Sequence, residues 1–178
     1  MKKIFFFVPL ISIFILLLLI GIALLKKDSI FQNNNVKSVL IKKQFPKEEI
    51  LSLNNQKLIN LQDNLGTPFL LNFFSSWCEP CKYEAEYLEV LSNKIMIIGI
   101  AYKDKETDVY GFLNNFGNPY KKIGSDANGE TAINWGVYGV PETFLIDKDG
   151  IIILRHAGPI TKDVMINEIL PKLKEINL

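Results

Sequence analysis

The chain has 178 residues, of which 48% are hydrophobic and 22% charged, with 20 Lys and Arg against 19 Asp and Glu. This length describes one domain, and a net charge of +1 excludes a strongly basic surface for nucleic acid. Two cysteines and one histidine are too few for a four-ligand structural zinc site or for a disulfide-rich secreted scaffold. We therefore expect no metal, no cofactor and no nucleic-acid partner.

The N-terminal segment is an almost unbroken apolar run from Ile4 to Leu25, with lysines before and after it. It is long enough to cross a bilayer and longer than the hydrophobic core of a cleaved signal peptide. We therefore predict an uncleaved transmembrane helix as an anchor within residues 1–27, and cleavage near Gly21-Ile22-Ala23 is the alternative. Because lysines flank both ends, the positive-inside rule does not decide the orientation.

Residues 28–43 are polar and aperiodic, which is typical of a tether, and a folded domain is predicted over 44–178. In this domain short apolar runs alternate with helical patterns, as in an α/β protein. Strands are expected at 50–53, as an edge strand, and at 69–74, 95–100, 143–146 and 151–155; helices are expected at 81–91, 105–116 and 163–175. Buried strands, flanking helices and a C-terminal hairpin with an Asp149-Gly150 turn predict a thioredoxin-like fold around a central mixed sheet.

Trp77-Cys78-Glu79-Pro80-Cys81 places two thiols three residues apart where a buried strand ends and a helix begins. Both sulfurs then lie on the first turn of one helix, close enough for a reversible disulfide, and Pro80 suits that turn. Free backbone N–H groups and the helix dipole favour the thiolate of Cys78. We predict Cys78 as the nucleophile and Cys81 as the resolving thiol. A static disulfide or half of an intermolecular metal site is the alternative.

A second motif, GVYGVPE, ends in Val140-Pro141-Glu142 immediately before an apolar strand, and a proline that enters a strand needs an explanation. In a thioredoxin-like fold this proline is cis and packs beside the CxxC pair. The backbone groups of the preceding residue are then free to pair with an extended substrate. Val140 and Pro141 are therefore predicted to bind the substrate, and an ordinary turn before an edge strand is the alternative.

Three segments, LLNFFSSWCEPCKYE, GVYGVPETFLIDKDG and RHAG, resemble the CcmG/DsbE family of membrane-anchored thiol:disulfide interchange proteins of bacterial cytochrome c maturation. The resemblance covers the chain from about Val36 to its C-terminus. It implies Pro141 as the cis-proline and Glu84 and Glu142 as two active-site acids. One departure is Glu79-Pro80, where many members carry Pro-Thr, and this leaves the reduction potential open.

The resemblance also implies a function and a location. The reduced protein would reduce the disulfide of the haem-binding CxxCH site of apocytochrome c, and an integral membrane thiol carrier would recharge it. A single-pass anchor would hold the domain in the bacterial inner membrane, facing the periplasm. The anchor would keep the domain close to both partners at raised effective concentration.

Ordinary thioredoxins hold a buried Asp on the strand that leads to the CxxC pair, and Asn72 occupies the matching position here. Because an amide cannot accept the proton of the resolving thiol, Glu84 or Glu142 would take this role. Each negative charge would also raise nearby thiol pKa values, so we expect a less acidic Cys78 than in a strong oxidant. A solvated helix residue is the alternative for Glu84. Trp77 is expected to shield the disulfide and contact the substrate, or else to pack in the core.

Other functions stay open. The protein would instead be a general periplasmic thiol:disulfide exchanger if its partners were diverse. It would be a non-catalytic module if apocytochrome merely bound along the Val140 edge. A thiol peroxidase fits less well. The single arginine of this chain is Arg155, and the resolving Cys81 lies only three residues from Cys78. The single histidine, His156, is expected to be packed or solvated outside the site.

Overall fold

The computed structural model describes the chain except residues 1–7, 32–39, 55 and 177–178. It divides into two units, Met1–Val36 and Lys37–Leu178. The first part of the predicted anchor and residues 32–39 of the predicted tether therefore lie outside the described residues.

The first unit contains one helix, α1, among its described residues, and this helix runs from Val8 to Phe31. From Ile11 to Ile22 its side chains are almost all apolar, and the large ones are exposed. Among the residues that the structure places, no helix combines the length and hydropathy of a membrane span.

The second unit is built on a mixed sheet of seven strands. The strands are β1 (Glu49–Ser52), β2 (Leu58–Asn60), β3 (Phe69–Phe74), β4 (Met96–Tyr102), β5 (Lys122–Asp126), β6 (Glu142–Ile146) and β7 (Ile152–Ala157). Their order across the sheet is β2-β1-β5-β4-β3-β6-β7. The central strands β3, β4 and β5 are parallel, and all other neighbours are antiparallel. The predicted mixed sheet and its C-terminal hairpin are confirmed.

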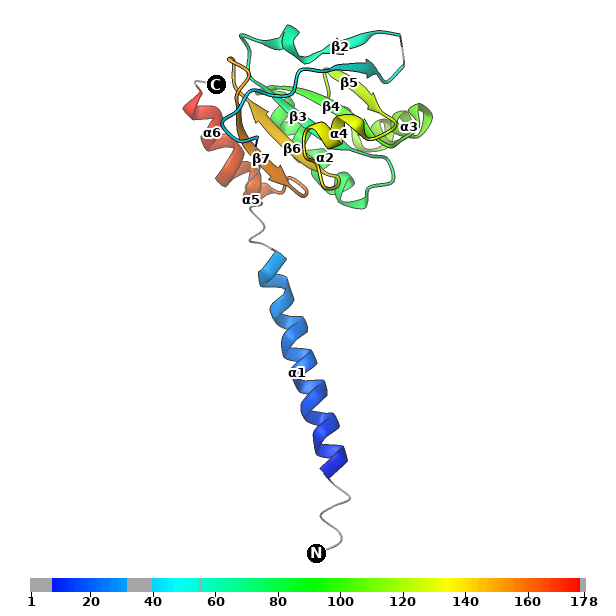
Figure 1. Ribbon diagram of the computed structural model, residues 1–178, viewed down its shortest axis with the longest axis vertical. Helices are drawn as coiled ribbons and strands as arrows, with labels where there is room; N and C mark the ends of the chain where they lie inside the picture. Colours follow the sequence, from blue (N-terminus) through cyan, green and yellow to red (C-terminus); the bar gives the residue numbers. More distant parts are fainter. Residues whose placement is uncertain (1–7, 32–39, 55, 177–178) are drawn as a thin grey trace, which may run out of the picture. The chain divides into compact units, whose positions relative to one another are not determined.

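Helices cover both faces of this sheet (Figure 1). They are α2 (Glu79–Ser92), α3 (Glu106–Phe116), α4 (Glu130–Asn134), α5 (Lys162–Val164), α6 (Leu170–Glu175), the 3₁₀ turn η2 (Leu61–Asn64) and the π-helical segment η3 (Met165–Ile169). Side chains of α2, α3 and the C-terminal helices pack in one core cluster, and side chains of α4 and η2 pack in the other. The sheet therefore separates two cores.

Strand β3 carries side chains into both cores, and all six of them are buried. Leu70 and Phe74 belong to the cluster with α2, whereas Phe69, Leu71 and Phe73 belong to the opposite cluster. This division follows from the two-residue period of a strand. Because a strand buried on both faces is apolar at nearly every position, this run, broken only by Asn72, predicted the central strand correctly.

The expectation of an edge strand at 50–53 is wrong in its position. β1 pairs with β2 on one side and with β5 on the other, so it lies inside the sheet. Neither neighbour was expected, because β2 has only three residues and β5 reads Lys-Ile-Gly-Ser-Asp. Such short or polar segments show no strand period, and their pairing depends on tertiary contacts.

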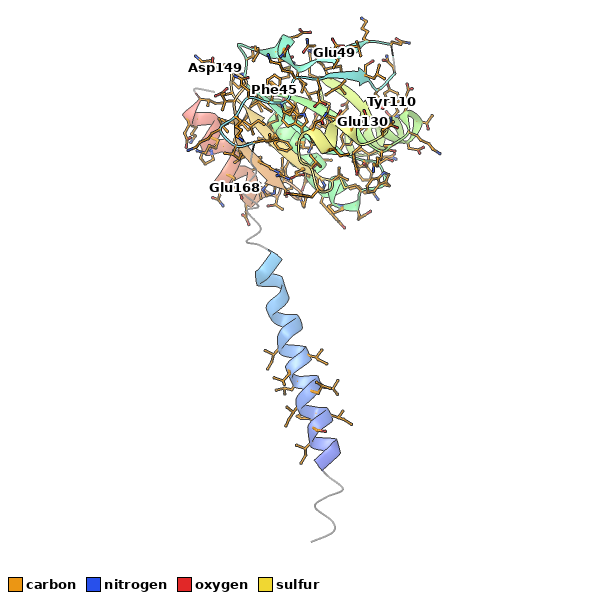
Figure 2. The ribbon with its side chains drawn as sticks, viewed as in Figure 1. Phe45, Glu49, Tyr110, Glu130, Asp149 and Glu168 are labelled. Carbon is orange, nitrogen blue, oxygen red and sulfur yellow. A yellow bond between two sulfur atoms is a disulfide. The ribbon has the colours of Figure 1, made fainter. Side chains whose placement is uncertain are left out.

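The chain before β1 packs against β7, the edge strand on the opposite side of the sheet from β2. The backbone N–H of Lys42 donates to the carbonyl of Ile152, and the N–H of Ile152 donates to the carbonyl of Lys43, at 2.8 and 2.9 Å. Phe45, labelled in Figure 2, is buried and stacks on Trp135 with ring centroids 6.2 Å apart. The last residues of the predicted tether are therefore hydrogen-bonded to the domain.

The C-terminal helix expected at 163–175 is present with one irregularity. Between α5 and α6 the backbone forms a π-helical turn over Met165–Ile169, which ends two residues before Pro171. A proline has no N–H for the carbonyl four residues back, and its ring would clash with that carbonyl. The wider turn accommodates this proline without ending the helix.

Candidate active site

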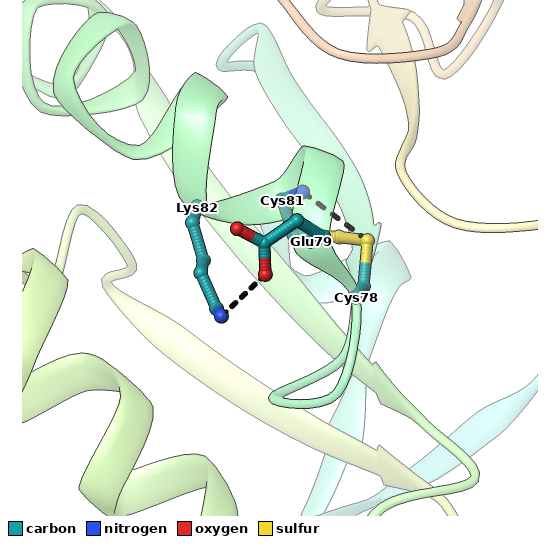
Figure 3. A network of polar contacts seen from close by, with 4 residues as sticks. All are labelled: Cys78, Glu79, Cys81 and Lys82. Carbon is teal, nitrogen blue, oxygen red and sulfur yellow. Dashed lines mark hydrogen bonds and ion pairs between the residues drawn. A yellow bond between two sulfur atoms is a disulfide. The ribbon is translucent and has the colours of Figure 1, made fainter.

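The two cysteines lie at the start of α2, directly after the loop that follows β3 (Figure 3). Cys78 is the N-cap residue, and a disulfide joins it to Cys81 across a Cα–Cα distance of 5.3 Å. The backbone N–H of Cys81 donates a 3.2 Å hydrogen bond to the Sγ of Cys78. Because the same N–H would face a thiolate, the geometry favours the ionised form of Cys78 in the reduced protein.

The turn between the cysteines faces the surface. Glu79 and Pro80 are exposed, and the Nζ of Lys82 lies 2.5 Å from a carboxylate oxygen of Glu79 (Figure 3). The cysteines themselves are nearly buried, with exposed fractions of 3% for Cys78 and 2% for Cys81. The dipeptide in which this chain departs from many family members is thus solvent-facing, while the sulfurs are mostly shielded from water.

The loop before Cys78 is held by the loop that follows β4. The carboxylate of Asp104 accepts hydrogen bonds from the N–H of Ser76 at 2.5 Å and from its hydroxyl at 3.0 Å. The indole Nε1 of Trp77 donates to the carbonyl of Lys103 at 3.3 Å, and its ring is 59% exposed. Trp77 therefore stands at the surface next to Cys78 in the chain, and the alternative of a core residue is excluded.

Glu84 lies one turn beyond Cys81 on the same buried face of α2. It has no exposed surface. Its Oε1 accepts a 2.9 Å hydrogen bond from the Nδ2 of Asn72, and its Oε2 accepts a 3.0 Å hydrogen bond from the N–H of Ile160. The alternative of a solvated helix residue is therefore excluded.

Burial raises the pKa of Glu84 from its ordinary 4.5 to about 7, although the hydrogen bonds from Ile160 and Asn72 oppose this change. Residues three apart on a helix are neighbours on one face, so Glu84 and Cys81 share the buried face of α2. A carboxyl that titrates near neutral pH beside a thiol is suited to accept and return the thiol proton.

The peptide bond between Val140 and Pro141 is cis, as predicted. Pro141 is buried, and its carbonyl accepts a 2.9 Å hydrogen bond from the N–H of Gly158. Within the described ranges, the backbone N–H and carbonyl of Val140 have no hydrogen-bond partner. Val140 therefore offers the donor and acceptor that an extended peptide needs for strand-like pairing.

Glu142 begins β6, is 1% exposed and forms an ion pair with Arg155 of β7. The Nε of Arg155 donates to Oε1 of Glu142 at 2.6 Å, and the N–H of Tyr138 donates to Oε2 at 3.2 Å. Burial raises the pKa of Glu142, and the bonds from Arg155 oppose that rise. The guanidinium also donates to the carbonyl of Gly136 at 2.7 Å, and its Cζ lies 5.0 Å from the ring centre of Tyr138. Arg155 thus ties β6 to the loop that leads to Pro141.

The two acids lie on opposite faces of the sheet. The Asn72 amide that binds Glu84 also donates to the hydroxyl of Thr143 at 3.0 Å, so Thr143 faces the same side as Glu84. Because side chains alternate along a strand, Glu142 points to the other side. Cys81 belongs to the core cluster on the Glu84 side. The structure therefore brings only Glu84 against the buried face below the thiols, and a catalytic part for Glu142 stays a prediction.

His156 lies on β7, where its Nδ1 is 3.3 Å from a carboxylate oxygen of Glu168. It is half-buried, and its side chain contacts Glu168 of the C-terminal helical segment. In the part of the chain that the structure describes, no three His, Cys, Asp or Glu side chains gather into a group that could hold a metal ion.

Comparison with known proteins agrees with this geometry. Residues 35–170 match the Redoxin family. The chain is 38% identical to the thiol:disulfide interchange protein DsbE of Tatumella citrea, over 96% of this chain and 94% of that protein. It is 42% identical to DsbE of Escherichia coli strain K12, over 77% of this chain and 76% of that protein. The chain belongs to the DsbE family. It is therefore a thiol:disulfide oxidoreductase.

Solved structures support the thioredoxin-like fold of this DsbE-family chain. A secreted thiol-disulfide isomerase from Corynebacterium glutamicum is similar with a TM-score of 0.64 at 23% identity, covering 74% of this chain and 86% of that one. A secreted Mycobacterium tuberculosis disulfide oxidoreductase homologous to E. coli DsbE has a TM-score of 0.62 at 18% identity, covering 70% and 96%. The predicted fold class of the domain is confirmed.

Three residues at the DsbE-family site were not predicted as site residues from the sequence: Asp104, Arg155 and Tyr120, whose hydroxyl donates a 2.7 Å hydrogen bond to Oδ1 of Asn72. Asp104 lies in the loop after β4, and Tyr120 lies just before the polar strand β5. No sequence motif or hydrophobic period marks either residue. Arg155 carries a signal in the sequence, because it is the single arginine of the chain and stands in the RHAG segment, but this signal does not reveal its partner Glu142. Each reaches the site only through the packing of distant segments.

Proposed function

We propose that this protein reduces the disulfide of the haem-binding CxxCH site of apocytochrome c during cytochrome c maturation. The observation that carries the proposal is the sulfur of Cys78 at the N-terminus of α2, with the N–H of Cys81 directed at it. Membership of the DsbE family supports it, as does the backbone of Val140, which has no hydrogen-bond partner among the residues that the structure describes.

In the proposed reaction the thiolate of Cys78 attacks one sulfur of the substrate disulfide. A mixed disulfide forms, and the other substrate sulfur leaves as a thiolate that takes up a proton. Cys81 then attacks the Sγ of Cys78, which releases the second substrate thiol. The substrate gains two electrons and two protons, and the protein is left with the Cys78–Cys81 disulfide seen in this structure.

Cys81 must lose its proton before it can attack, and we assign Glu84 as the acceptor. Asn72, on the strand that leads to the cysteines, has no basic atom for this task. Glu84 lies one helical turn from Cys81, and burial brings its pKa to about 7. A base whose pKa lies near the working pH takes a thiol proton and gives it back at low cost.

We further propose that Val140, Pro141 and Trp77 form the surface that receives the substrate. The backbone of Val140 supplies strand-like hydrogen bonds beside the cysteines. Trp77 presents an exposed ring at the mouth of the disulfide, held by its bond to Lys103. Since the sulfurs are nearly buried, the substrate must be aligned closely before exchange.

The apolar run from Ile4 to Leu25 is proposed as an anchor in the bacterial inner membrane, with the domain on the periplasmic side. Exposed leucine and isoleucine side chains along α1 would then contact lipid. An integral membrane thiol carrier is proposed to reduce the Cys78–Cys81 disulfide after each cycle. Extraction of host membranes with alkaline carbonate, followed by protease treatment of intact spheroplasts, tests the anchor and the orientation.

The test of function traps the mixed disulfide. The full chain with Cys81→Ala is expressed in its host, thiols are blocked with acid and alkylating agent, and proteins bound to Cys78 are identified after non-reducing separation. Without a resolving thiol the adduct persists. We expect apocytochromes c among the adducts, together with an integral membrane thiol carrier.

The matched control carries Cys78→Ser and Cys81→Ala together and should trap nothing. If unrelated exported proteins were trapped on Cys78 instead, the protein would be a general thiol:disulfide exchanger. Absence of any adduct, with apocytochrome still copurifying, would replace it with a binding module.

A further inference from the structure

A closed group of polar side chains lies beneath the CxxC helix, where the surrounding core is apolar. The hydroxyl of Tyr120 donates a 2.7 Å hydrogen bond to Oδ1 of Asn72. The Nδ2 of Asn72 donates to Oε1 of Glu84 at 2.9 Å and to the hydroxyl of Thr143 at 3.0 Å. These four side chains are all buried. The group is thus isolated from bulk water and satisfies its own hydrogen bonds.

The two ends of the Asn72 amide have different chemical effects on Glu84. An ionised carboxylate accepts hydrogen bonds only, so it is stabilised by the NH₂ end and repelled by the carbonyl end. A half-turn of the amide would exchange these ends at little steric cost. Because the hydroxyl of Tyr120 donates to Oδ1, it holds the carbonyl end away from Glu84. Tyr120 thereby selects the orientation that stabilises the carboxylate.

The position of Tyr120 is itself determined by packing. Its ring stacks on Phe74 with centroids 4.6 Å apart. It also covers Gly99 so closely that a Cβ there would lie 2.8 Å from the Tyr120 ring. The phenol therefore has little freedom to leave Asn72, and the register that places Gly99 beside Asn72 brings ring and amide together.

We propose that Tyr120 and Asn72 are positioning residues that keep Glu84 ready to accept the proton of Cys81, with Tyr120 locking the amide and the amide donating to the carboxylate. This inference rests on the proposed role of Glu84 in thiol exchange. It assigns to Asn72 a specific task in place of the carboxylate that ordinary thioredoxins carry there: the amide tunes a base supplied by the helix above it.

The groups that face Glu84 leave few other controls on its protonation. They are Cys81 on α2, Asn72 on β3, Tyr120 before β5, Thr143 on β6 and the N–H of Ile160 before α5. Lys82, the nearest lysine along α2, is paired with Glu79 at the surface. Among the described residues, no Lys, Arg or His acts on the pKa of Glu84. Its proton affinity therefore depends on burial and on these hydrogen bonds.

The test uses Tyr120→Phe in the full chain, which removes one hydroxyl and keeps the ring. We expect the pKa of Glu84, followed by ¹³C NMR of its carboxyl in the oxidised protein, to rise by about half to one unit. We also expect the midpoint of the pH–rate profile, measured for resolution of a preformed Cys78 mixed disulfide, to move to higher pH by the same amount. The rate should fall about two- to fivefold at pH 7 and recover near pH 8.5. Tyr83→Phe, an exposed tyrosine of α2, is the matched control and should change neither reading.

A second background separates positioning from general damage. In Glu84→Gln, Tyr120→Phe should leave the pH profile unchanged, because the group on which it acts has no proton to exchange. Thr143→Val is the second single variant. It removes the other acceptor of the amide while Tyr120 still holds Oδ1, so we expect a smaller rise in the pKa of Glu84 than Tyr120→Phe causes.

An unchanged pKa of Glu84 in Tyr120→Phe would overturn the inference, as would an equal loss of rate in the Glu84→Gln background. If Tyr120→Phe does not fold, no rise in Thr143→Val would overturn it. Failure of the proposed function has a different signature. In that case the wild-type protein would not resolve the mixed disulfide with an apocytochrome peptide. The NMR titration would still decide whether Tyr120 and Asn72 control the pKa of Glu84.

Discussion

Glu84 and Glu142 are two buried glutamates of one domain with opposite electrostatic surroundings. Glu84 is held by the amide of Asn72 and the N–H of Ile160, both neutral donors. Glu142 is held by the guanidinium of Arg155. The first carboxyl can take up a proton near neutral pH without losing an ionic partner, whereas the second would abandon a buried cation.

Glutamate thus serves two purposes in this domain. The face of the sheet on which each carboxyl lies decides its partner and therefore its task. Glu84, beside Cys81, is suited to proton exchange. Glu142, together with Arg155, joins β6 to the loop that carries Tyr138 and ends at the cis-proline. We interpret Glu84 as a chemical group and the ion pair of Glu142 with Arg155 as a structural clamp, while a catalytic part for Glu142 stays a prediction.

The largest effect is expected from Arg155→Met, which leaves the carboxylate of Glu142 buried without its cation. Such a loss costs about 3–5 kcal/mol of unfolding free energy. Urea unfolding at pH 7 measures it. Adding Glu142→Gln should recover most of the stability, because a neutral amide needs no cation. A loss below about 1 kcal/mol would mean that Glu142 does not depend on Arg155.

A smaller effect, visible only against pH, is expected from Glu84→Gln. The folded pKa of Glu84, about 7, lies above the ordinary 4.5, so between these values the native state binds more protons than the unfolded chain. Its contribution is therefore present below about pH 4.5 and is lost as pH rises through 7. Between pH 4.5 and 8, the unfolding free energy of the variant should therefore rise relative to that of the wild type by on the order of 3 kcal/mol. Paired unfolding curves measure the difference, and one independent of pH would contradict the prediction.

The smallest effect on stability is expected from breaking an exposed ion pair at the start of α2. Glu79 pairs with Lys82, but the side chains are 63% and 33% exposed. Lys82→Gln should therefore change the unfolding free energy by less than about 0.5 kcal/mol at pH 7. A cost comparable to that of Arg155→Met would show that charge pairing, rather than burial, separates the two buried glutamates.

Much of the fold was predictable because its signals are local. The run from Phe69 to Phe74 indicates a doubly buried strand, and the Asp149-Gly150 turn indicates the hairpin. By contrast, β2 and β5 lack a strand period, so their presence depends on neighbours far along the chain. At the site, the spacing of Cys78 and Cys81 was informative because a helix turn brings such residues together.

The thioredoxin-like core, the dithiol at the start of a helix and the proline beside it were predictable from the amino-acid sequence. These features follow from hydrophobic period, helix capping and residue spacing, which act over a few residues. Three contacts arise from packing instead: Glu84 rather than Glu142 lies on the side of the sheet that holds the thiols, Tyr120 reaches Asn72, and Arg155 binds Glu142. Those contacts join segments separated by up to 76 residues, as between Glu84 and Ile160, so they depend on strand order and register that no local pattern contains.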